Sequence, residues 1–502
     1  MADDIPTYCH QRHPQLSTNF TVYTVRLTTD GTNYYYQWTR DQGGPPSQTD
    51  TGEIIVKLDW SQMAGGLSAP YDVSTYAVAG VAGYVLLQTN AIADLDGHAL
   101  ADYPLHLIGH SRGGSLMSQI SLLLGTNGLW VDQLTTLDPH PLNNDGNDDF
   151  PLTIVDAPVR TYANVLFHDN YWQNLGDGAF VPDGEPVAGA YVRQLSDLSG
   201  GYPPASYDFV NPYEYHSNVH LWYHGSIDLN VPASYDDDGE SVTIDATMRT
   251  NWWVPYEGSG AVAGFHYSLL GGGDRMSSDR PLGLPSDPAI VDGYNQNWDL
   301  GAGTSNSNRA ALPTNNGAWP NIIKFDISGT NVVAQNSLVN TTLYYQYAGA
   351  SNLTLQIYYD SDFNPYNSND VLIAQMQPPI TGAGYVSHYS NLGLTTTNVP
   401  PGVYAIYGKI SDGAHARYLY APERVQIVSS QQPPVLGIAK LNNTQLTVAV
   451  NGLSGQTIVL QTSTDLQHWL PVATNTITSG AWTYTNDVPP DFKEFYRAIL
   501  NP

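Results

Sequence analysis

The feature that most restricts the fold of this chain is a strand, a tight turn and a helix that follow one another without a spacer. Residues 105–108 (Leu-His-Leu-Ile) are mostly apolar and read as a strand. Residues 109–113 read Gly-His-Ser-Arg-Gly, and apolar residues then recur at helical spacing up to residue 124. A strand that leads directly into a helix is typical of a parallel sheet with crossover helices. Similar segments continue between residues 53 and 270, so the sequence predicts an α/β fold with a mostly parallel sheet over residues 1–285.

The second half of the chain has a different pattern. After residue 271, apolar and polar residues alternate with a period of two in short segments, and Asn, Gly, Asp and Pro separate these segments. This alternation is typical of the antiparallel strands of a β-sandwich. Residues 429–434 (Ser-Ser-Gln-Gln-Pro-Pro) read as a linker. We therefore expect an Ig-like β-sandwich over residues 286–430 and a small C-terminal β-module over residues 431–502.

The charge balance argues against two classes of partner. Lys and Arg total 18, Asp and Glu total 46, and the formal net charge is −28. A surface this acidic repels phosphate backbones and anionic membranes, so the sequence predicts no nucleic-acid partner and no polybasic membrane anchor. No apolar stretch has the length of a transmembrane segment. The single cysteine, Cys9, permits no intramolecular disulfide.

Composition also bears on the compartment. Charged residues make up only 13% of the chain, against about 25% in ordinary soluble domains, and polar residues, Gly, Pro and Tyr take their place. The first residues show no charged-then-apolar leader. We expect a secreted or periplasmic protein whose signal peptide is absent from this sequence. The oligomeric state is not predicted.

The turn at residues 109–113 has the residues expected of a nucleophile elbow. A sharp turn between strand and helix lifts the hydroxyl of Ser111 above the sheet, and the helix N-terminus stabilises negative charge beside it. We expect Gly109 and Gly113 to provide the room that this turn needs. The backbone N–H of Arg112 then becomes a donor to the oxyanion. The sequence therefore predicts that Ser111 is a nucleophile.

This segment resembles the α/β-hydrolase lipases, and the resemblance extends to both sides of the elbow. Residues 58–60 (Leu-Asp-Trp) are similar to a Val-Asp-Trp strand end of pancreatic-type lipases, and residues 137–139 (Leu-Asp-Pro) to the strand end that carries their catalytic acid. Residues 219–227 are similar to the segment that bears the catalytic histidine of fungal lipases. The resemblance covers about residues 54–229. It implies a serine carboxyl-ester hydrolase that forms an acyl-enzyme, with a lipid or an insoluble polymer as a possible ester substrate.

The catalytic base has three candidates. A serine hydroxyl needs a neighbouring imidazole to take its proton, and the expected chain order is serine, acid, histidine. The resemblance favours His220. However, His216 and His224 lie four residues to either side, and a helix would place all three on one face. Spacing alone therefore leaves the choice open.

The acid has two candidates. Asp138 follows the strand after the elbow helix and carries the closer match to the lipases, so it is the preferred acid. Asp169 is the alternative, because we expect it to end the next strand, which is the more usual position in this fold. A carboxylate at either place could fix the tautomer of the histidine.

The second oxyanion donor has no candidate. Lipases of this type place a His-Gly pair after an early strand, and its loop supplies the second N–H. No His-Gly pair precedes Asp59, and the loops at residues 28–33 and 40–45 lack the pattern. Either another backbone donor substitutes, or residues before Met1 were lost.

A metal is not required for this chemistry, but acidic loops suggest structural calcium. Residues 143–149 contain Asp145, Asp148 and Asp149 directly after the proposed acid, and calcium takes six to eight such oxygen ligands. Further acidic loops lie at residues 236–240 and 360–364. We expect at least one calcium ion, with no other cofactor.

The sequence leaves three hypotheses about function. The first is a lipase or esterase with a Ser-His-Asp triad. The second is an esterase that cleaves polyesters or cell-wall esters without interfacial activation. The third is a lipase-like binding protein in which an incomplete oxyanion hole abolishes turnover.

Overall fold

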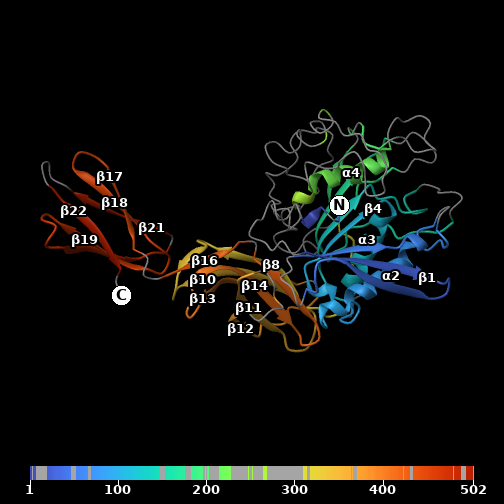
Figure 1. Ribbon diagram of the computed structural model, residues 1–502, viewed down its shortest axis with the longest axis horizontal. Coiled ribbons are helices and arrows are strands. Elements are labelled where there is room, and N and C mark those ends of the chain that lie inside the picture. The colour runs from blue at the N-terminus through green and yellow to red at the C-terminus, as the bar shows by residue number, and fades with distance from the viewer. Residues whose placement is uncertain are drawn as a thin grey trace.

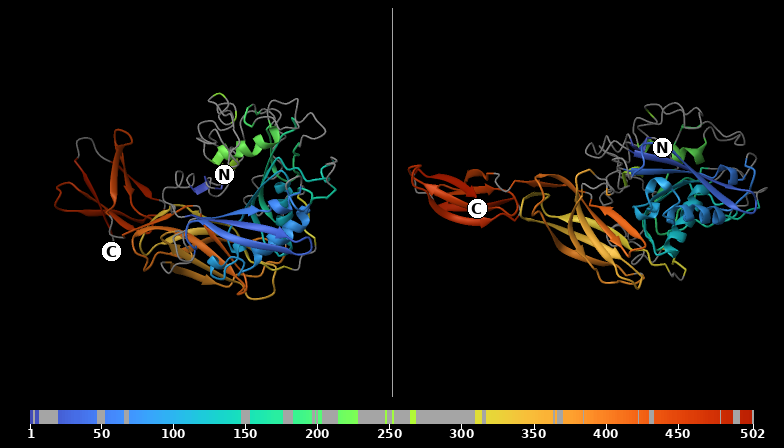
Figure 2. Two further views of the ribbon diagram at one scale, coloured as in Figure 1. Left: turned by 45° about the vertical axis from the view of Figure 1, so that its right-hand side comes forward. Right: turned by 60° about the horizontal axis from the view of Figure 1, so that its bottom comes forward.

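The structure is a computed structural model of the 502-residue chain (Figure 1). It describes residues 1–2, 4–6, 20–46, 53–65, 69–146, 153–175, 183–195, 198, 200–202, 214–227, 247, 252, 264–267, 309–313, 317–362, 365, 370–383, 385–421, 423–429, 433–478, 480–487 and 493–500. Three parts follow one another in space as they do in sequence (Figures 1 and 2). An α/β part is followed by a β-sandwich and then by a C-terminal module.

The α/β part contains two sheets in its described residues. Its strands are β1 (Phe20–Thr29), β2 (Tyr34–Gln42), β3 (Glu53–Asp59), β4 (His106–His110), β5 (Val131–Leu137), β6 (Val165–Trp172) and β7 (Tyr191–Gln194). The first sheet has the order β2-β1-β3, with β1 antiparallel to β2 and parallel to β3. The second has the order β4-β5-β6-β7, and all its strands are parallel.

In the part of the chain that the structure describes, three helices cover the sheets and position the site. They are α2 (Thr75–Leu87), α3 (Arg112–Thr126) and α4 (Tyr215–Ile227), and short 3₁₀ turns lie at Ser61–Met63, Ala93–Leu95, Leu100–Asp102 and Gly264–Tyr267. Leu107 of β4 packs in a core with side chains of α2 and α3, whereas its neighbour Ile108 packs in a second core with side chains of α4. Successive strand residues point to opposite faces, so α2 and α3 cover one face of the sheet and α4 covers the other.

The prediction of an α/β region is confirmed, with one difference in the sheet. Strands β5 and β6 are buried at nearly every position, as expected for parallel strands covered by helices on both faces. Strand β3 is only partly buried throughout, and in the described residues it shares no hydrogen bonds with β4. The continuous sheet that we expected is therefore divided into two between β3 and β4.

The β-sandwich follows the period-two pattern of the sequence. Its strands are β8 (Asn321–Ser328), β9 (Val332–Ala334), β10 (Leu338–Gln346), β11 (Thr354–Asp360), β12 (Val371–Met376), β13 (Ser387–Thr395), β14 (Gly402–Ser411), β15 (Ala416–Tyr420) and β16 (Val425–Val428). One sheet has the order β13-β10-β8, and the other has the order β12-β11-β14-β16-β9 with β15 paired to β14. Their inner faces share one apolar core, and every pair is antiparallel except β16 with β9.

The C-terminal module is a smaller antiparallel unit. Its strands are β17 (Val435–Lys440), β18 (Gln445–Asn451), β19 (Thr457–Ser463), β20 (Leu470–Thr476), β21 (Ala481–Asp487) and β22 (Phe495–Leu500). They form two three-stranded sheets, β17-β18-β21 and β20-β19-β22. The predicted boundary after residue 430 falls between β16 and β17, while the boundary after residue 285 lies outside the described residues.

A buried polar interface joins the sandwich to the α/β part. Arg417 of β15 is almost fully buried, and its guanidinium lies 2.7 Å from the carboxylate of Asp132 at the start of β5. It also donates to the carbonyl oxygens of Ala101, at 3.0 Å, and Tyr103, at 2.5 Å. Because β5 begins here, the sandwich is docked at the end of the parallel sheet opposite to the one from which the elbow emerges.

Candidate active site

The elbow has the backbone conformation that its sequence predicts. Strand β4 ends at His110, α3 begins at Arg112, and Ser111 alone forms the turn between them. Ser111 has φ 56° and ψ −128°, a conformation that L-residues rarely adopt. Strain of this kind costs of order 1–3 kcal/mol and is found at functional sites. The prediction of a strained strand-to-helix turn at Ser111 is therefore confirmed.

The glycines of the turn differ from the expectation. A Cβ atom on Gly109 would lie 2.1 Å from the carbonyl oxygen of Gly113, and a Cβ atom on Gly114 would lie 2.9 Å from the Cβ of Pro139. By contrast, a Cβ atom on Gly113 would meet nothing within 4 Å. The expectation that Gly113 provides room was wrong, because the crowding falls on the next helical residue, which faces the segment after Asp138.

Asp138 lies beside Ser111 at the same edge of the sheet. In the parallel register His110 of β4 is opposite Leu137 of β5, so the next residues in each strand leave the sheet together. The backbone N–H of Ser111 donates to the carbonyl oxygen of Leu137 at 3.0 Å. Asp138 itself has a positive φ of 42°, so its strand also ends in a sharp turn.

The histidine that pairs with Asp138 is His216. Its Nδ1 lies 2.7 Å from Asp138 Oδ2, and the carboxylate is fully buried. Gln173 donates two further hydrogen bonds to the same carboxylate, from its backbone N–H and from its side-chain amide, each at 2.8 Å. In the ionised form that a catalytic triad requires, the Asp138 carboxylate only accepts, so Nδ1 of His216 then carries the proton and its Nε2 can accept one.

His110 attaches α4 to the elbow. Its Nε2–H donates to the backbone carbonyl oxygen of His216 at 3.0 Å, and the two imidazole rings lie 4.4 Å apart between centroids. Because His110 directly precedes Ser111, this contact holds His216 next to the nucleophile elbow. The arrangement brings residues 111, 138 and 216 together from three separate elements.

Burial shifts the pKa values of both His216 and Asp138. It lowers the pKa of His216, and the nearby charge of His140 adds to that shift, so His216 is neutral at pH 7. Burial also raises the pKa of Asp138, which the N–H donors of Gln173 and Gly184 oppose. A neutral imidazole with one available nitrogen is the form that a general base requires.

The other two histidines of α4 lie on the same helix face but have different neighbours. The ring of His220 lies 4.8 Å from that of His110 and 5.5 Å from that of Tyr202. His224 lies one turn further on, with its Nε2 2.5 Å from the carboxylate of Asp4. The prediction that His220 is the base stays a prediction, and the pairing with Asp138 favours His216.

Asp169 lies inside a strand rather than at its end. It is opposite Thr135 in the register of β5 with β6, and β6 continues to Trp172. Its buried carboxylate accepts from the Thr135 hydroxyl at 2.7 Å and from the Gln133 amide at 3.0 Å. The expectation that Asp169 ends its strand was wrong, and the carboxyl end of β6 instead supplies Gln173 to the carboxylate of Asp138.

The side chain of Arg112 is part of the wall around the elbow. Its Nε and Nη2 lie 2.7 and 2.8 Å from the two oxygens of the buried Asp156 carboxylate. No local pattern predicts this pair, since the two residues are 44 positions apart. The sequence predicts a role only for the backbone N–H of Arg112.

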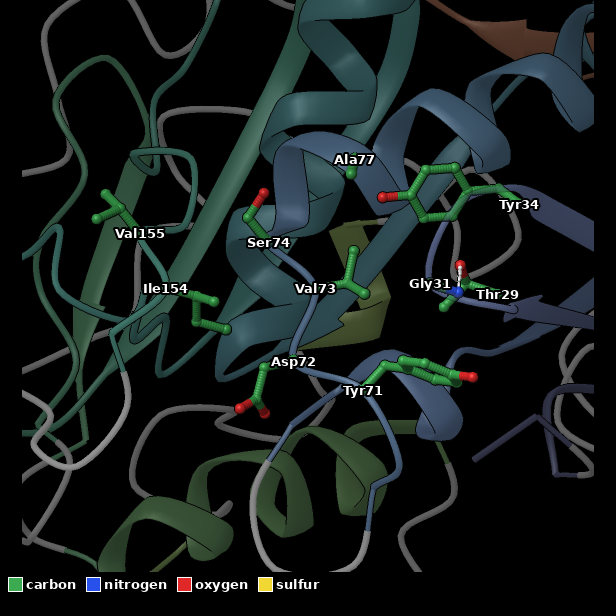
Figure 3. A pocket seen from close by; sticks show the side chains of 10 residues that line it. All are labelled: Thr29, Gly31, Tyr34, Tyr71, Asp72, Val73, Ser74, Ala77, Ile154 and Val155. Atoms are coloured by element: carbon green, nitrogen blue, oxygen red, sulfur yellow. Dashed lines mark hydrogen bonds between the residues drawn. The ribbon is translucent and has the colours of Figure 1, made fainter.

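A surface pocket adjoins this ion pair (Figure 3). It has a volume of about 440 Å³ and is lined by Thr29, Gly31, Tyr34, Tyr71, Asp72, Val73, Ser74, Ala77, Ile154 and Val155. Tyr34 and Tyr71 lie on one side of it, and Ile154 and Val155 lie on the other. None of these lining residues belongs to the group formed by Ser111, Asp138 and His216.

The predicted calcium loop is only partly described. Asp145 lies 2.7 Å from Nδ1 of His140, whereas Asp148 and Asp149 lie outside the described residues. In the part of the chain that the structure describes, no group of three His, Cys, Asp or Glu side chains could hold a metal ion. Calcium therefore stays a prediction from the sequence.

Three further observations concern the helices and the similarity to known proteins. Among its described helices, none has the length and apolar character needed to cross a membrane. No family model matches the sequence. No curated protein matches it either.

Solved structures give distant likenesses to parts of the chain. One is the CARDB domain of the PF1109 protein from Pyrococcus furiosus in complex with di-metal ions, with 14% identity, 22% of this chain and 96% of that chain covered, and a TM-score of 0.15. Two crystal forms of a cytokine receptor complex match with 15% and 14% identity, each over 36% of this chain and over 91% and 84% of theirs, with TM-scores of 0.13 and 0.14. Likenesses this distant say nothing about the activity of this chain.

Proposed function

We propose that the protein is a serine carboxyl-ester hydrolase of the lipase or esterase type. One observation carries the proposal: a serine in a strained strand-to-helix turn directly follows His110, and His110 contacts a buried histidine, His216, that is hydrogen-bonded to the buried Asp138. Positioned nucleophile, base and carboxylate are the three parts that acyl transfer to a serine requires. The fold of the α/β part, with these residues at one edge of a parallel sheet, is consistent with this chemistry.

In the proposed mechanism, Ser111 Oγ attacks the ester carbonyl carbon while Nε2 of His216 accepts the hydroxyl proton. The carboxylate of Asp138 stabilises the imidazolium through the Nδ1 hydrogen bond. The backbone N–H of Arg112 stabilises the oxyanion of the tetrahedral intermediate. The imidazolium then protonates the departing alcohol, and water deacylates the serine by the same steps in reverse order.

The test compares two histidines that share one helix. His216→Ala is expected to lower kcat on a p-nitrophenyl ester by at least about 10³-fold, because the general base is lost. His220→Ala is the matched control, since it changes the same helix face one turn away, and we expect kcat to stay within about tenfold of the wild type.

Chemical labelling checks the nucleophile independently of substrate choice. A fluorophosphonate probe should label the wild type and not Ser111→Ala, and mass spectrometry should place the adduct on Ser111. A wild type that is neither labelled nor active on short-chain or long-chain esters would refute the enzyme proposal and favour a binding protein. A larger loss in His220→Ala than in His216→Ala would refute the assignment of the base.

A further inference from the structure

The side chain of Arg112 connects the nucleophile elbow to the loop that follows β3. Its Nη1 donates to the carbonyl oxygen of Ala64, and its guanidinium lies 5.0 Å from the centroid of the Trp60 ring. Both contacts fall in residues 60–65, directly after the end of β3. The Arg112 side chain therefore connects this loop to the residue that directly follows Ser111.

The same guanidinium also holds the start of α2. Its Nη2 donates to the carbonyl oxygen of Val73 at 3.0 Å, in addition to its bond to Asp156. The other Asp156 contacts extend the connection, because Oδ1 accepts the backbone N–H of Thr75 at 2.9 Å. Oδ2 accepts the backbone N–H of Leu142 at 3.1 Å, in the segment that follows Asp138. One ion pair thus fixes three segments around the elbow.

We propose that the Arg112 side chain is a positioning residue that holds the residue 60–65 loop and the segment after Asp138 in register with Ser111. This inference rests on the proposed function, because it concerns the same nucleophile. Arg112 is the first residue of α3, so the side chain that makes these contacts belongs to the residue whose backbone N–H is the proposed oxyanion donor. We expect displacement of the guanidinium to move the start of α3, and with it the direction of that N–H.

The planar guanidinium is what makes the arrangement specific. It forms two parallel bonds with Asp156 and still directs donors to two backbone carbonyl oxygens. A lysine keeps the positive charge but offers a single point of attachment, so it cannot hold all of these groups at once. A shift of about 1 Å in the groups around a reacting centre can cost about 10²-fold in rate.

A second buried arginine in the chain provides a matched control. Arg417 also pairs with a buried carboxylate, that of Asp132, and also donates to backbone carbonyl oxygens, but at the opposite end of the sheet from Ser111. Arg112→Lys and Arg417→Lys therefore each remove a guanidinium that joins a buried carboxylate to backbone carbonyl oxygens, at two distances from the elbow. A purely structural role predicts similar effects of both substitutions on stability and on activity.

The experiment measures kcat and KM on a p-nitrophenyl ester, the rate of labelling by a fluorophosphonate, and Tm for each variant. We expect both substitutions to lower Tm, and Arg112→Lys alone to lower kcat and the labelling rate by about 10²-fold, with KM changed less than about threefold. Asp156→Asn should reproduce the loss of kcat, and it serves as the second variant if Arg112→Lys fails to fold.

The outcomes separate this inference from the proposed function. A wild type that neither cleaves esters nor reacts with the probe would overturn the function. An active wild type together with Arg112→Lys at a kcat within about threefold of it would overturn only the positioning role. An equal loss of kcat in Arg417→Lys would also overturn that role, because it would show a general effect of lost stability.

Discussion

The substitution Asp138→Asn tests the proposed triad most directly. The Asp138 carboxylate accepts two hydrogen bonds from Gln173, each at 2.8 Å, and lies 2.7 Å from His216 Nδ1. An asparagine retains one acceptor oxygen but presents an NH₂ group in place of the other. If the NH₂ group occupies the Oδ2 position, it faces Nδ1 and the Gln173 amide, both of which are donors in the wild type. His216 must then carry its proton on Nε2, where it can no longer accept the proton of Ser111.

The expected loss of kcat in Asp138→Asn follows from the loss of the correct His216 tautomer. An Asp-to-Asn change in a Ser-His-Asp triad of another fold lowers kcat by about 10⁴-fold, and a loss of that size corresponds to about 5.5 kcal/mol in the activation free energy. The stability change should be smaller, about 1–3 kcal/mol, because one buried donor loses its acceptor while a buried charge is removed. Activity should therefore fall far more than stability.

The assay pairs this variant with Asp169→Asn. Asp169 is also fully buried and also accepts hydrogen bonds from two side chains, so its substitution causes a comparable structural disturbance. Ester hydrolysis and thermal unfolding are measured for both variants. If Asp169→Asn loses more activity than Asp138→Asn, or if Asp138→Asn keeps more than about a tenth of the wild-type kcat, the reasoning is refuted.

Three further predictions concern the turn, the interface and the pH profile. Gly114→Ala should lower the free energy of unfolding by about 1–3 kcal/mol, because its added Cβ would meet Pro139, whereas Gly113→Ala should not. Denaturant unfolding of both variants checks this prediction. Arg417→Met should lower the free energy of unfolding by about 3–5 kcal/mol, because it leaves the buried carboxylate of Asp132 unpaired. Adding Asp132→Leu to this variant should restore much of the lost stability. His140→Gln should move the acidic limb of the pH profile of kcat/KM to higher pH, because the charge of His140 lowers the pKa of His216, the proposed base. An acidic limb that stays in place or moves to lower pH would contradict this prediction.

Some features were predictable because they depend only on neighbouring residues. The strand, the turn and the helix around Ser111 are contiguous, so hydrophobic spacing and two glycines were enough to predict a strained serine between β4 and α3. The strands of the sandwich were predictable for the same reason, since a period of two is a local property. Helix α4 was not predicted, because the sequence showed only that a helix would place its three histidines on one face.

Other features depend on how distant segments meet. His216, His220 and His224 are equivalent by spacing, and only the docking of α4 against His110 and Asp138 distinguishes the first. Whether a carboxylate lies at the end of a strand or three residues before it depends on the sheet register. No local pattern contains that information.

What the sequence by itself determined is the local geometry at Ser111 and the order of an α/β part before two β-modules, because backbone preferences and side-chain periodicity act over a few residues. The tertiary structure decided which histidine meets Asp138, which glycine is crowded, and that Arg112 reaches Asp156 across 44 positions. These depend on contacts between elements far apart in the chain, and packing in a dense interior selects them only once the whole α/β part has formed.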